Sequence, residues 1–440
     1  MNLSSKIAYN TLIQVISKII ATILGLFTIA IITRYLGQTG FGEYTTIIAF
    51  TSIFAIIADL GLTLVTAQMI SQPGADQEKI LKNLFGLRLV SAIISLVPAP
   101  LVVIFFPYAP IVKWGVAITA FSFLFSSLNQ IPVGIFQKKL RMDKVSFAEV
   151  AGRIILFLGT LIAVRFNYGL LGIMFAAGAS NILSFALHYI FAAKFAKIGF
   201  AFDKIIWREI IKKSWPIALT IALNLIYLKT DTLILSLVKP QAAVGIYGAA
   251  YKVIDVVITL PFMFAGVILP IMTASWVEKN GGKFKESMQK SFDFMAIIAM
   301  PLMFGAQFTA RPLMALVAGK EFAESGEVLR ILILAAGAIF LGSIFSHGII
   351  AINKQKKIIG AYLFTAITAV AAYIIFIPRF SYFGAAWATV YSETMIAFFS
   401  AYFIWKYAGF LPNLKIFFKS LAASIVMGIF LFLIGPENFS

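Results

Sequence analysis

Six basic residues interrupt segments that are otherwise apolar, and they are the residues of this sequence best suited to chemistry. Four of them are candidate substrate-binding residues: Lys18, Arg88, Arg153 and Lys252. A Lys or Arg at mid-bilayer costs about 2.5–3.5 kcal/mol on insertion scales, so such residues usually face a wet interior. There their charged groups can donate strong hydrogen bonds to phosphate oxygens. We therefore predict that these cations bind the anionic part of a solute.

Each cation also has a purely structural alternative. Arg153 follows Glu149 by four residues, and Lys252 precedes Asp255 by three, so each pair could simply neutralise itself on one helix face. Arg88 lies nearer a membrane edge, and its long side chain could reach water. Lys18 lies about 13 Å into its apolar segment at 1.5 Å per residue, which is farther than a lysine side chain reaches.

Four carboxylates inside apolar segments are candidate ion-coupling residues: Asp59, Asp231, Asp255 and Glu393. A partly desolvated carboxylate can take up a proton near neutral pH, and it can also bind sodium. Static pairing with a cation of the same interior is the alternative for each. His188 and His347 could carry protons, although a lone intramembrane histidine more often hydrogen-bonds a neighbouring helix.

The sequence lacks the patterns of soluble enzymes. It has no cysteine, so disulfides, thiolate metal sites and a cysteine nucleophile are excluded. It also lacks GxxxxGK, HExxH and GxSxG motifs. We therefore predict no catalytic residues, no metal site and no cofactor, and we do not expect the chain to be an enzyme or an ATP-driven pump on its own.

The elements that must position these residues are membrane-spanning helices. The chain has 440 residues, of which 61% are hydrophobic and 12% are charged, and its mean hydropathy is +0.95. Soluble domains are about 45–50% apolar and about 25% charged. Apolar runs of about 20 residues match a lipid core roughly 30 Å thick. Thirteen such runs are predicted at 9–33, 44–70, 84–106, 114–137, 146–164, 169–193, 214–237, 244–272, 291–310, 329–352, 358–378, 382–405 and 416–434.

The basic residues alternate between the two sets of connecting loops. Of the 36 Lys and Arg residues, 23 lie in the N-terminus and the even-numbered loops, and 7 lie in the other loops. This bias predicts a cytoplasmic N-terminus in a cell membrane. It also accounts for the net charge of +18 without a nucleic-acid partner. An odd number of spans places the C-terminus outside, so a fourteenth helix could be missing from this chain.

The two halves of the sequence resemble each other. Residues 35–44 read YLGQTGFGEY and residues 238–247 read VKPQAAVGIY, and both place Gly-x-Tyr at the start of the next apolar segment. Six predicted spans separate these two loops. An even number of spans predicts parallel repeats, related by an axis along the membrane normal.

Several strings resemble the polysaccharide-transport family of the multidrug/oligosaccharidyl-lipid/polysaccharide exporter superfamily. They are Ala8–Thr11, Thr33–Gly37, Phe41–Tyr44, Asp59–Leu62, Thr230–Leu233, Val244–Lys252, Ala351–Lys356 and Gly384–Thr389. The resemblance extends over essentially the whole chain. It implies an all-α polytopic membrane protein with two six-helix bundles around a central cavity, here 1–195 and 196–405, and an additional C-terminal helix in 406–440. Members have 12 or 14 spans, so thirteen departs from the family.

The resemblance also implies a function: a flippase that moves polyprenyl-pyrophosphate-linked oligosaccharide across the cytoplasmic membrane by alternating access. The expected partners are this lipid-linked substrate, membrane lipid, a proton or sodium ion, and the polysaccharide polymerase machinery. A cation- or proton-coupled drug antiporter of the same superfamily is the first alternative. A membrane oligosaccharide polymerase or ligase is the second alternative. Such enzymes usually need a large extracytoplasmic loop, which this chain lacks.

Overall fold

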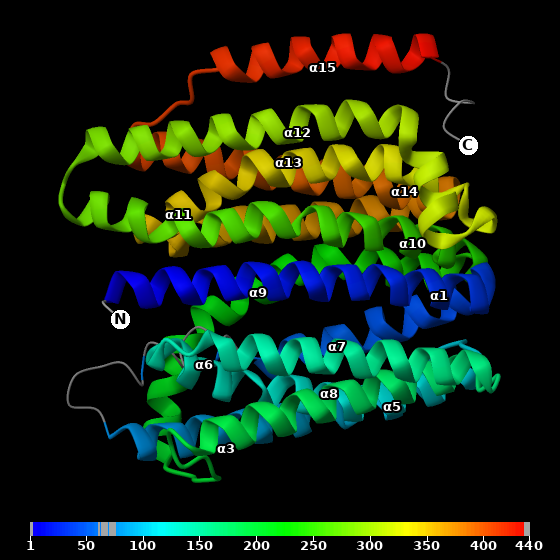
Figure 1. Cartoon of the computed structure of the whole chain (residues 1–440), viewed down its shortest axis with the longest axis vertical. Coiled ribbons are helices and arrows are strands. Elements are labelled where there is room, and N and C mark those ends of the chain that lie inside the picture. Colours follow the sequence, from blue (N-terminus) through cyan, green and yellow to red (C-terminus); the bar gives the residue numbers. More distant parts are fainter. Residues whose placement is uncertain (1–2, 60–61, 63–68, 70–75, 435–440) are drawn as a thin grey trace. The chain divides into compact units, whose positions relative to one another are not determined.

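The computed structural model describes residues 3–59, 62, 69 and 76–434, and helices are the only regular secondary structure in those ranges (Figure 1). The longer helices are α1 (Leu3–Asp59), α3 (Gln77–Leu96), α5 (Pro110–Leu128), α6 (Gln130–Lys139), α7 (Met142–Arg165), α8 (Gly169–Ala193), α9 (Lys204–Val238), α10 (Gln241–Val257), α11 (Thr259–Val277), α12 (Gly281–Ala318), α13 (Ser325–Ala351), α14 (Ile359–Ala408) and α15 (Lys415–Ile434). Short helical pieces are α4 (Pro98–Val102), η1 (Val103–Phe105), η2 (Lys320–Phe322) and η3 (Gln355–Ile358).

Eleven helical segments of the described ranges are long and apolar enough to cross a membrane. Two of them, Leu12–Ile56 and Gln355–Ala408, contain 45 and 54 residues. At 1.5 Å per residue each would extend beyond about 65 Å, roughly twice the lipid core. Each is broken near its middle by a residue with positive φ, Gly37 (φ 63°) in α1 and Ser381 (φ 53°) in α14. Each therefore provides two crossings, in agreement with about thirteen predicted spans.

The prediction of an all-α polytopic membrane protein is confirmed. Its second predicted span, 44–70, is seen only in part, because most of residues 60–75 lie outside the described residues. The chain forms two compact units, residues 1–225 and 226–440, and the boundary in sequence falls within α9. The predicted domain limits of 1–195, 196–405 and 406–440 stay a prediction.

Small residues bring the helices of unit 1 into close contact. Ser180 of α8 donates a hydrogen bond to the carbonyl of Gly152 on α7 (2.7 Å). A Cβ added at Gly159 of α7 would lie 2.8 Å from the Cβ of Ala176 on α8. Within a bilayer, lipid tails are as apolar as leucine, so close packing and interhelical hydrogen bonds drive helix association. These contacts hold α7 and α8 in a defined register.

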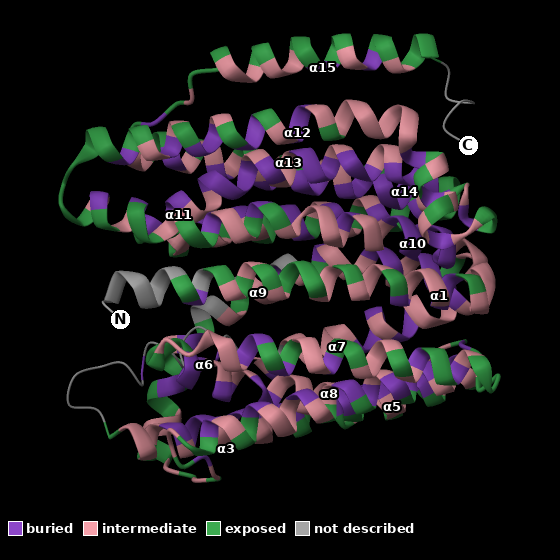
Figure 2. Cartoon of the chain, in the orientation of Figure 1, coloured by how far each residue is buried: buried purple, intermediate pink, exposed green. Residues whose placement is uncertain are grey.

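In unit 2, α13 is the central helix, and 67% of its most apolar stretch is buried. It packs against α12 and α14, and the backbone of α14 approaches so closely that a Cβ at Gly342 would meet the Cβ of Ala397 at 2.7 Å. The C-terminal helix α15 contacts only α12 among the strongly packed pairs. It is largely exposed in Figure 2, and its buried residues are Ser424 and Gly428.

Candidate functional site

Unit 1 holds an ion pair deep among its helices. Arg88 on α3 pairs with Asp59 at the end of α1, and only 2% of the arginine side chain is exposed. Its Nε also donates to Oγ of Ser127 on α5 (3.3 Å). Ser91, one turn later on α3, donates to the carbonyl of Ala58 (2.7 Å). Three helices therefore position the guanidinium, and α3 is tied to α1 at two successive turns.

A polar cavity of about 200 Å³ opens beside this pair. Its lining residues are Ala55, Asp59, Arg88, Phe123, Ser126, Ser127 and Gln130. A cavity of this size, with hydroxyl, amide and charged groups on its wall, can hold several water molecules. It can also admit a small anionic group to the arginine. The sequence prediction that Arg88 faces a polar interior agrees with this geometry.

A second charged group lies on α1 and α7. Lys18 of α1 is exposed, as are Glu149 and Arg153 of α7, and the charges of both cations act on the carboxylate of Glu149. Among the ion pairs of the described residues, none joins these three side chains. The predicted static Glu149–Arg153 pair is therefore not formed here.

Two polar residues of α1 near Lys18, Asn10 and Ser17, make contacts outside their own helix. Asn10 donates to the carbonyl of Leu140 (2.8 Å) and accepts from the amide of Met142 (2.7 Å), so it fixes the turn between α6 and α7. Ser17 donates to Ser146 on α7 (2.8 Å). These contacts dock α1 against α7, and they leave the neighbouring lysine exposed on the same helix.

In unit 2, Asp231 lies at the centre of a buried hydroxyl network. Its side chain is fully buried on α9, and Tyr247 of α10 donates to its carboxylate (2.6 Å). The Tyr247 hydroxyl lies 3.3 Å from Oγ1 of Thr389 on α14. Tyr373 of α14 donates to the carbonyl of Tyr227 on α9 (2.8 Å). Three hydroxyl groups from α10 and α14 thus form a network beside this carboxylate, and that of Tyr247 bonds to it directly.

A small cavity of about 50 Å³ lies in the same unit. Its polar lining residues are Lys229, Tyr251, Asp255, Thr389 and Glu393. Glu393 is 7% exposed. The Lys229 ammonium lies 5.2 Å from the centre of the Tyr251 ring. The structure therefore brings two of the predicted carboxylates, Asp255 and Glu393, to one cavity, while Asp231 belongs to the adjoining hydroxyl network.

Lys252 and Asp255 form an ion pair along α10 (3.6 Å), with side chains 30% and 38% exposed. This is the arrangement expected if the two residues neutralise each other. Partial exposure leaves the lysine able to reach another anion. Lys18, Arg88 and Arg153 belong to unit 1 and Lys252 to unit 2, so each unit contributes at least one intramembrane cation.

The two histidines bind their own helices. Nδ1 of His188 donates to the carbonyl of Ser184 (2.7 Å), and Nδ1 of His347 donates to that of Ser343 (2.8 Å). Each acceptor lies one turn earlier. Both contacts favour a structural role over proton transfer.

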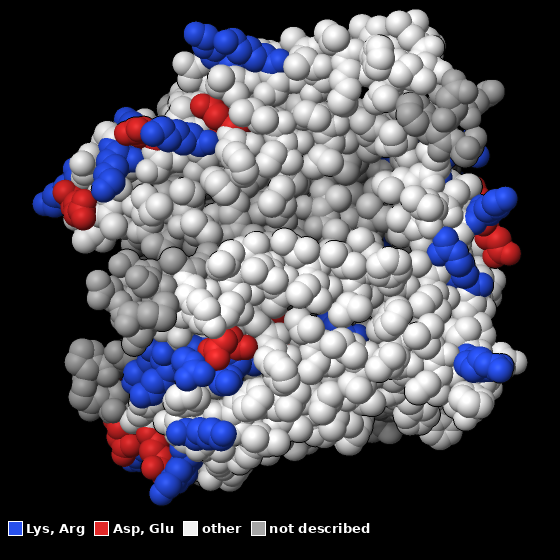
Figure 3. Space-filling model, in the orientation of Figure 1, with Lys and Arg blue, Asp and Glu red and all other residues white. Residues whose placement is uncertain are grey.

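Charged residues lie at the ends of the helices, whereas the long flanks between them are almost uncharged on the face drawn in Figure 3. This distribution is typical of a protein surrounded by lipid. The chain matches the polysaccharide biosynthesis protein family over residues 7–276, more than half of its length. It belongs to that family. The predicted relationship to the polysaccharide-transport branch of the exporter superfamily is thereby confirmed.

Comparison with one relative and two solved structures agrees with this assignment. The capsular polysaccharide biosynthesis protein CapF of Staphylococcus aureus is 23% identical over 288 residues, which cover 64% of this chain and 72% of CapF. The structure is similar to the lipid II flippase MurJ in an inward closed conformation, with a TM-score of 0.78, 17% identity and coverage of 96% and 92% of the two chains. An inward-facing multidrug resistance MATE family transporter gives a TM-score of 0.71 at 15% identity, with coverage of 91% and 98%. At these identities the two structures show a shared two-lobe transporter fold.

Sequence reasoning missed several residues of the unit 2 site. Tyr247 was noted for the internal repeat and the family resemblance, Thr389 only for the resemblance, and Tyr373 was not among the candidate residues. Lys229 was not among the candidate residues, yet it lines the neighbouring cavity. A lysine two residues before a buried aspartate, inside an apolar segment, was the available signal.

Proposed function

We propose that this protein is a flippase for polyprenyl-pyrophosphate-linked oligosaccharide in the cytoplasmic membrane, and that it works by alternating access for polysaccharide biosynthesis. Membership of the polysaccharide biosynthesis family supports the substrate class. The observation that carries the proposal is the exposed Lys18 within an apolar helix, beside Arg153 and Glu149. An exposed ammonium at this depth requires either water or an anion.

The pyrophosphate head supplies such an anion. Ammonium and guanidinium groups form short, charge-assisted hydrogen bonds with phosphate oxygens, and these are stronger where water is scarce. Lys18, Arg88 and Arg153 provide them in unit 1, and Lys252 provides one in unit 2. Cations in both units would keep the head neutralised throughout the crossing. The N-terminus is proposed to be cytoplasmic, and the polysaccharide polymerase machinery to take up the product.

The carboxylates of unit 2 are proposed to couple transport to a proton or sodium gradient. Glu393 and Asp255 line one cavity with Lys229, and Asp231 lies in the hydroxyl network beside it. Asp59 is the corresponding candidate in unit 1, where it would exchange its partner Arg88 for a cation. Loss or gain of one positive charge at these groups would change which ion pairs form inside each unit.

A coupled antiporter for drugs or other solutes is the second candidate function. The unit 2 cavity is lined by Tyr251, Asp255 and Glu393 as well as by Lys229, and an aromatic ring with two acids is suited to a cation. The MATE fold similarity supports the same alternative. A polymerase or ligase activity has no comparable support, because the structural neighbours are transporters.

Lys18 provides the decisive experiment. The variants Lys18→Gln and Lys18→Arg are to be reconstituted with a fluorescent polyprenyl-pyrophosphate oligosaccharide, and its transfer between leaflets is to be measured. We expect Lys18→Gln to reduce transfer at least tenfold and Lys18→Arg to retain most of it, because the charge is what binds the pyrophosphate. Lys144→Gln, in the first turn of α7, is the matched control.

Two further outcomes separate the alternatives. Wild-type transfer by Lys18→Gln would contradict the pyrophosphate proposal. Gradient-driven export of an organic cation, without lipid transfer, would establish the antiporter instead. Coupling is tested with Asp59→Asn, Asp231→Asn, Asp255→Asn and Glu393→Gln. Unchanged gradient dependence in all four would exclude these carboxylates as the coupling site.

A further inference from the structure

Residues 194–208, which connect α8 to α9 and include the first turn of α9, present large apolar side chains outside the most apolar parts of the two helices. Phe200 is 58% exposed, Phe202 is 64% exposed and Ile205 is 80% exposed. The proposed transport reaction makes no use of them. We call residues 194–208 the α8–α9 segment.

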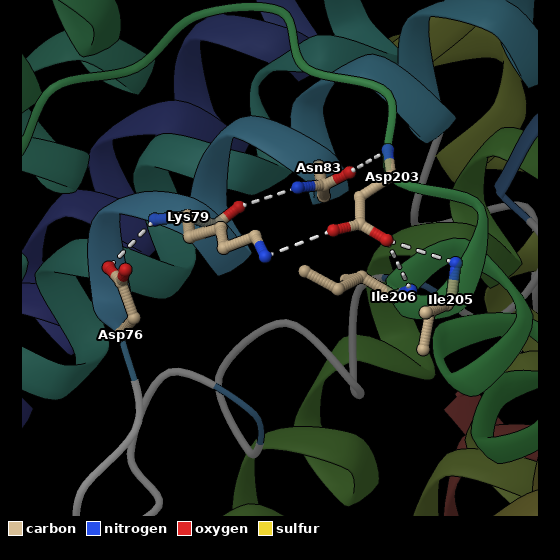
Figure 4. Close-up of polar contacts among 6 residues, drawn as sticks. All are labelled: Asp76, Lys79, Asn83, Asp203, Ile205 and Ile206. Atoms are coloured by element: carbon tan, nitrogen blue, oxygen red, sulfur yellow. Dashed lines mark hydrogen bonds and ion pairs between the residues drawn. The ribbon is translucent and has the colours of Figure 1, made fainter.

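One carboxylate holds this segment in a defined conformation (Figure 4). Asp203 accepts from the Lys79 ammonium (3.0 Å) and from the backbone amides of Ile205 (3.0 Å) and Ile206 (3.3 Å). Its own amide donates to Oδ1 of Asn83 (2.8 Å). The last turn before α9 is therefore bound to the first turns of α3 by side chains from both.

The backbone on the inner side of the segment is in close contact with α3. The amide of Ala201 donates to the carbonyl of Lys82 (3.2 Å). A Cβ added at Gly86 would lie only 2.5 Å from the Ala201 carbonyl oxygen, so glycine is required there. Ile198 is buried on the same side, 9% exposed. Because the inner side is packed against α3, Phe200 and Phe202 lie on the outer surface.

Basic residues accompany these apolar side chains. Lys194, Lys197, Lys204 and Arg208 are exposed, and none of the four forms an ion pair with another described residue. By contrast, the two acids of residues 194–213 are already engaged, Asp203 by Lys79 and Glu209 by Lys213. The positive charge of the α8–α9 segment is thus available to an external anion.

The position of the segment along the helices indicates which anion this is. It begins directly after α8 ends at Ala193, and it runs beside the first ten residues of α3, within about 15 Å of the start of that helix. Headgroups occupy this level of a bilayer, outside a lipid core of about 30 Å. Aromatic side chains are enriched at that depth, and Lys and Arg there attract anionic lipids.

We propose that the α8–α9 segment is a binding surface for anionic phospholipid headgroups. Phe200, Phe202 and Ile205 insert at the edge of the hydrocarbon, while the four unpaired basic residues contact the phosphates. Each Lys or Arg near an anionic surface strengthens binding by a factor of about five. Because the segment includes the first turn of α9, a helix with residues in both units, lipid composition would act on the helix that joins them. This surface is independent of the transported substrate.

The absence of cysteine allows a direct test in the full-length protein. Phe202→Cys and, separately, Phe200→Cys are labelled with a nitroxide and placed in nanodiscs of phosphatidylcholine with increasing phosphatidylglycerol. Accessibility to oxygen against a water-soluble nickel chelate reports the depth of each label. We expect both labels to move into the oxygen-rich region as phosphatidylglycerol increases.

The charges are then removed by the combined substitution K194Q/K197Q/K204Q/R208Q in the labelled protein. The phosphatidylglycerol fraction needed for half of the depth change should rise at least fivefold. The combined substitution K279Q/K283Q/K356Q/K357Q, which removes the same number of exposed charges near the start of α12 and in η3, should leave it unchanged. Labels that stay accessible to nickel at every lipid composition would overturn the proposal. So would an equal response of the two charge variants.

Discussion

Arg88 and Asp59 form an ion pair inside unit 1 in which the arginine side chain is 2% exposed and the aspartate side chain is 22% exposed. The pair lies at one wall of the cavity that contains Ser127 and Gln130. The aspartate is thus the member that solvent or a solute reaches first. Any ion that neutralises Asp59 weakens its attraction for the guanidinium, which would then be free to bind an anion from the cavity.

Removing one member of this pair should destabilise unit 1 strongly. Asp59→Asn leaves a buried, uncompensated guanidinium, and breaking buried pairs typically costs about 3–5 kcal/mol. The double variant Asp59→Asn/Arg88→Gln should recover much of that loss. Thermal unfolding of the detergent-solubilised protein measures both. Lys82→Gln, which removes the partner of the exposed Glu78, is the control and should change stability little. Equal losses in the single and double variants would show that packing dominates over charge.

The Tyr247 hydroxyl should contribute more to the stability of unit 2 than the Tyr251 hydroxyl does. Tyr247→Phe removes the donor to the buried Asp231 carboxylate, and an unsatisfied buried acceptor costs about 1–3 kcal/mol. Tyr251→Phe is the matched control, because its ring lies 5.5 Å from that of Tyr247 on the same helix and no hydrogen bond is formed by its hydroxyl within the described residues. Unfolding midpoints of the two variants give the comparison. A stability loss in Tyr251→Phe as large as in Tyr247→Phe would contradict the assignment.

Lys252 has two possible roles that one series of variants distinguishes. If it binds the substrate anion, Lys252→Gln should lower transport at least tenfold, Lys252→Arg should retain most of it, and Asp255→Asn should not rescue the Gln variant. If the pair at 3.6 Å only neutralises itself, the double change Lys252→Gln/Asp255→Asn should restore transport, because no unpaired charge remains. Surface glycan at matched membrane expression provides the readout.

The charge bias of the loops predicts sidedness. A single cysteine at Lys139, on the basic end of α6, should be protected from an impermeant thiol reagent in intact cells, and one at Lys239 should react. Permeabilised cells, in which both should react, provide the control. The reversed pattern would invert the side assigned to every loop.

The attachment of the α8–α9 segment to α3 should depend on pH only in acid. The hydrogen bond from Lys79 and the amide of Ile206 hold the pKa of Asp203 below its ordinary value. A lowered pKa means that the stabilisation is fully present above the unfolded value of about 3.9 and is lost as the pH falls below it. Hydrogen exchange of residues 199–206 should therefore stay slow from pH 7 to about pH 5. Asp203→Asn should accelerate it at neutral pH, whereas Asp76→Asn, at the start of α3, should not. Acceleration of wild-type exchange between pH 7 and 5 would argue against this contact.

The sequence by itself determined the class of the protein and most of its helices, because membrane insertion depends on local properties. A run of apolar residues long enough to span lipid must form a helix wherever it lies. The pairing of Lys252 with Asp255 was visible for the same reason, since residues three apart on one helix are neighbours. Even the breaks in α1 and α14, at Gly37 and Ser381, fall where the sequence predicted a connection, because charged residues, Gly or Pro interrupt the apolar runs there.

Only the tertiary structure decided which side chains of different helices meet. Asp231 finds Tyr247 on α10 and lies beside Thr389 on α14, and Arg88 finds Ser127 on α5. A helix that is apolar on all sides carries little information about its rotation, because lipid and protein interior are similarly apolar. Close contacts at glycine and serine set that rotation, as Gly152 and Ser180 do between α7 and α8. They depend on the shapes of two helices at once, which no single segment of the sequence contains.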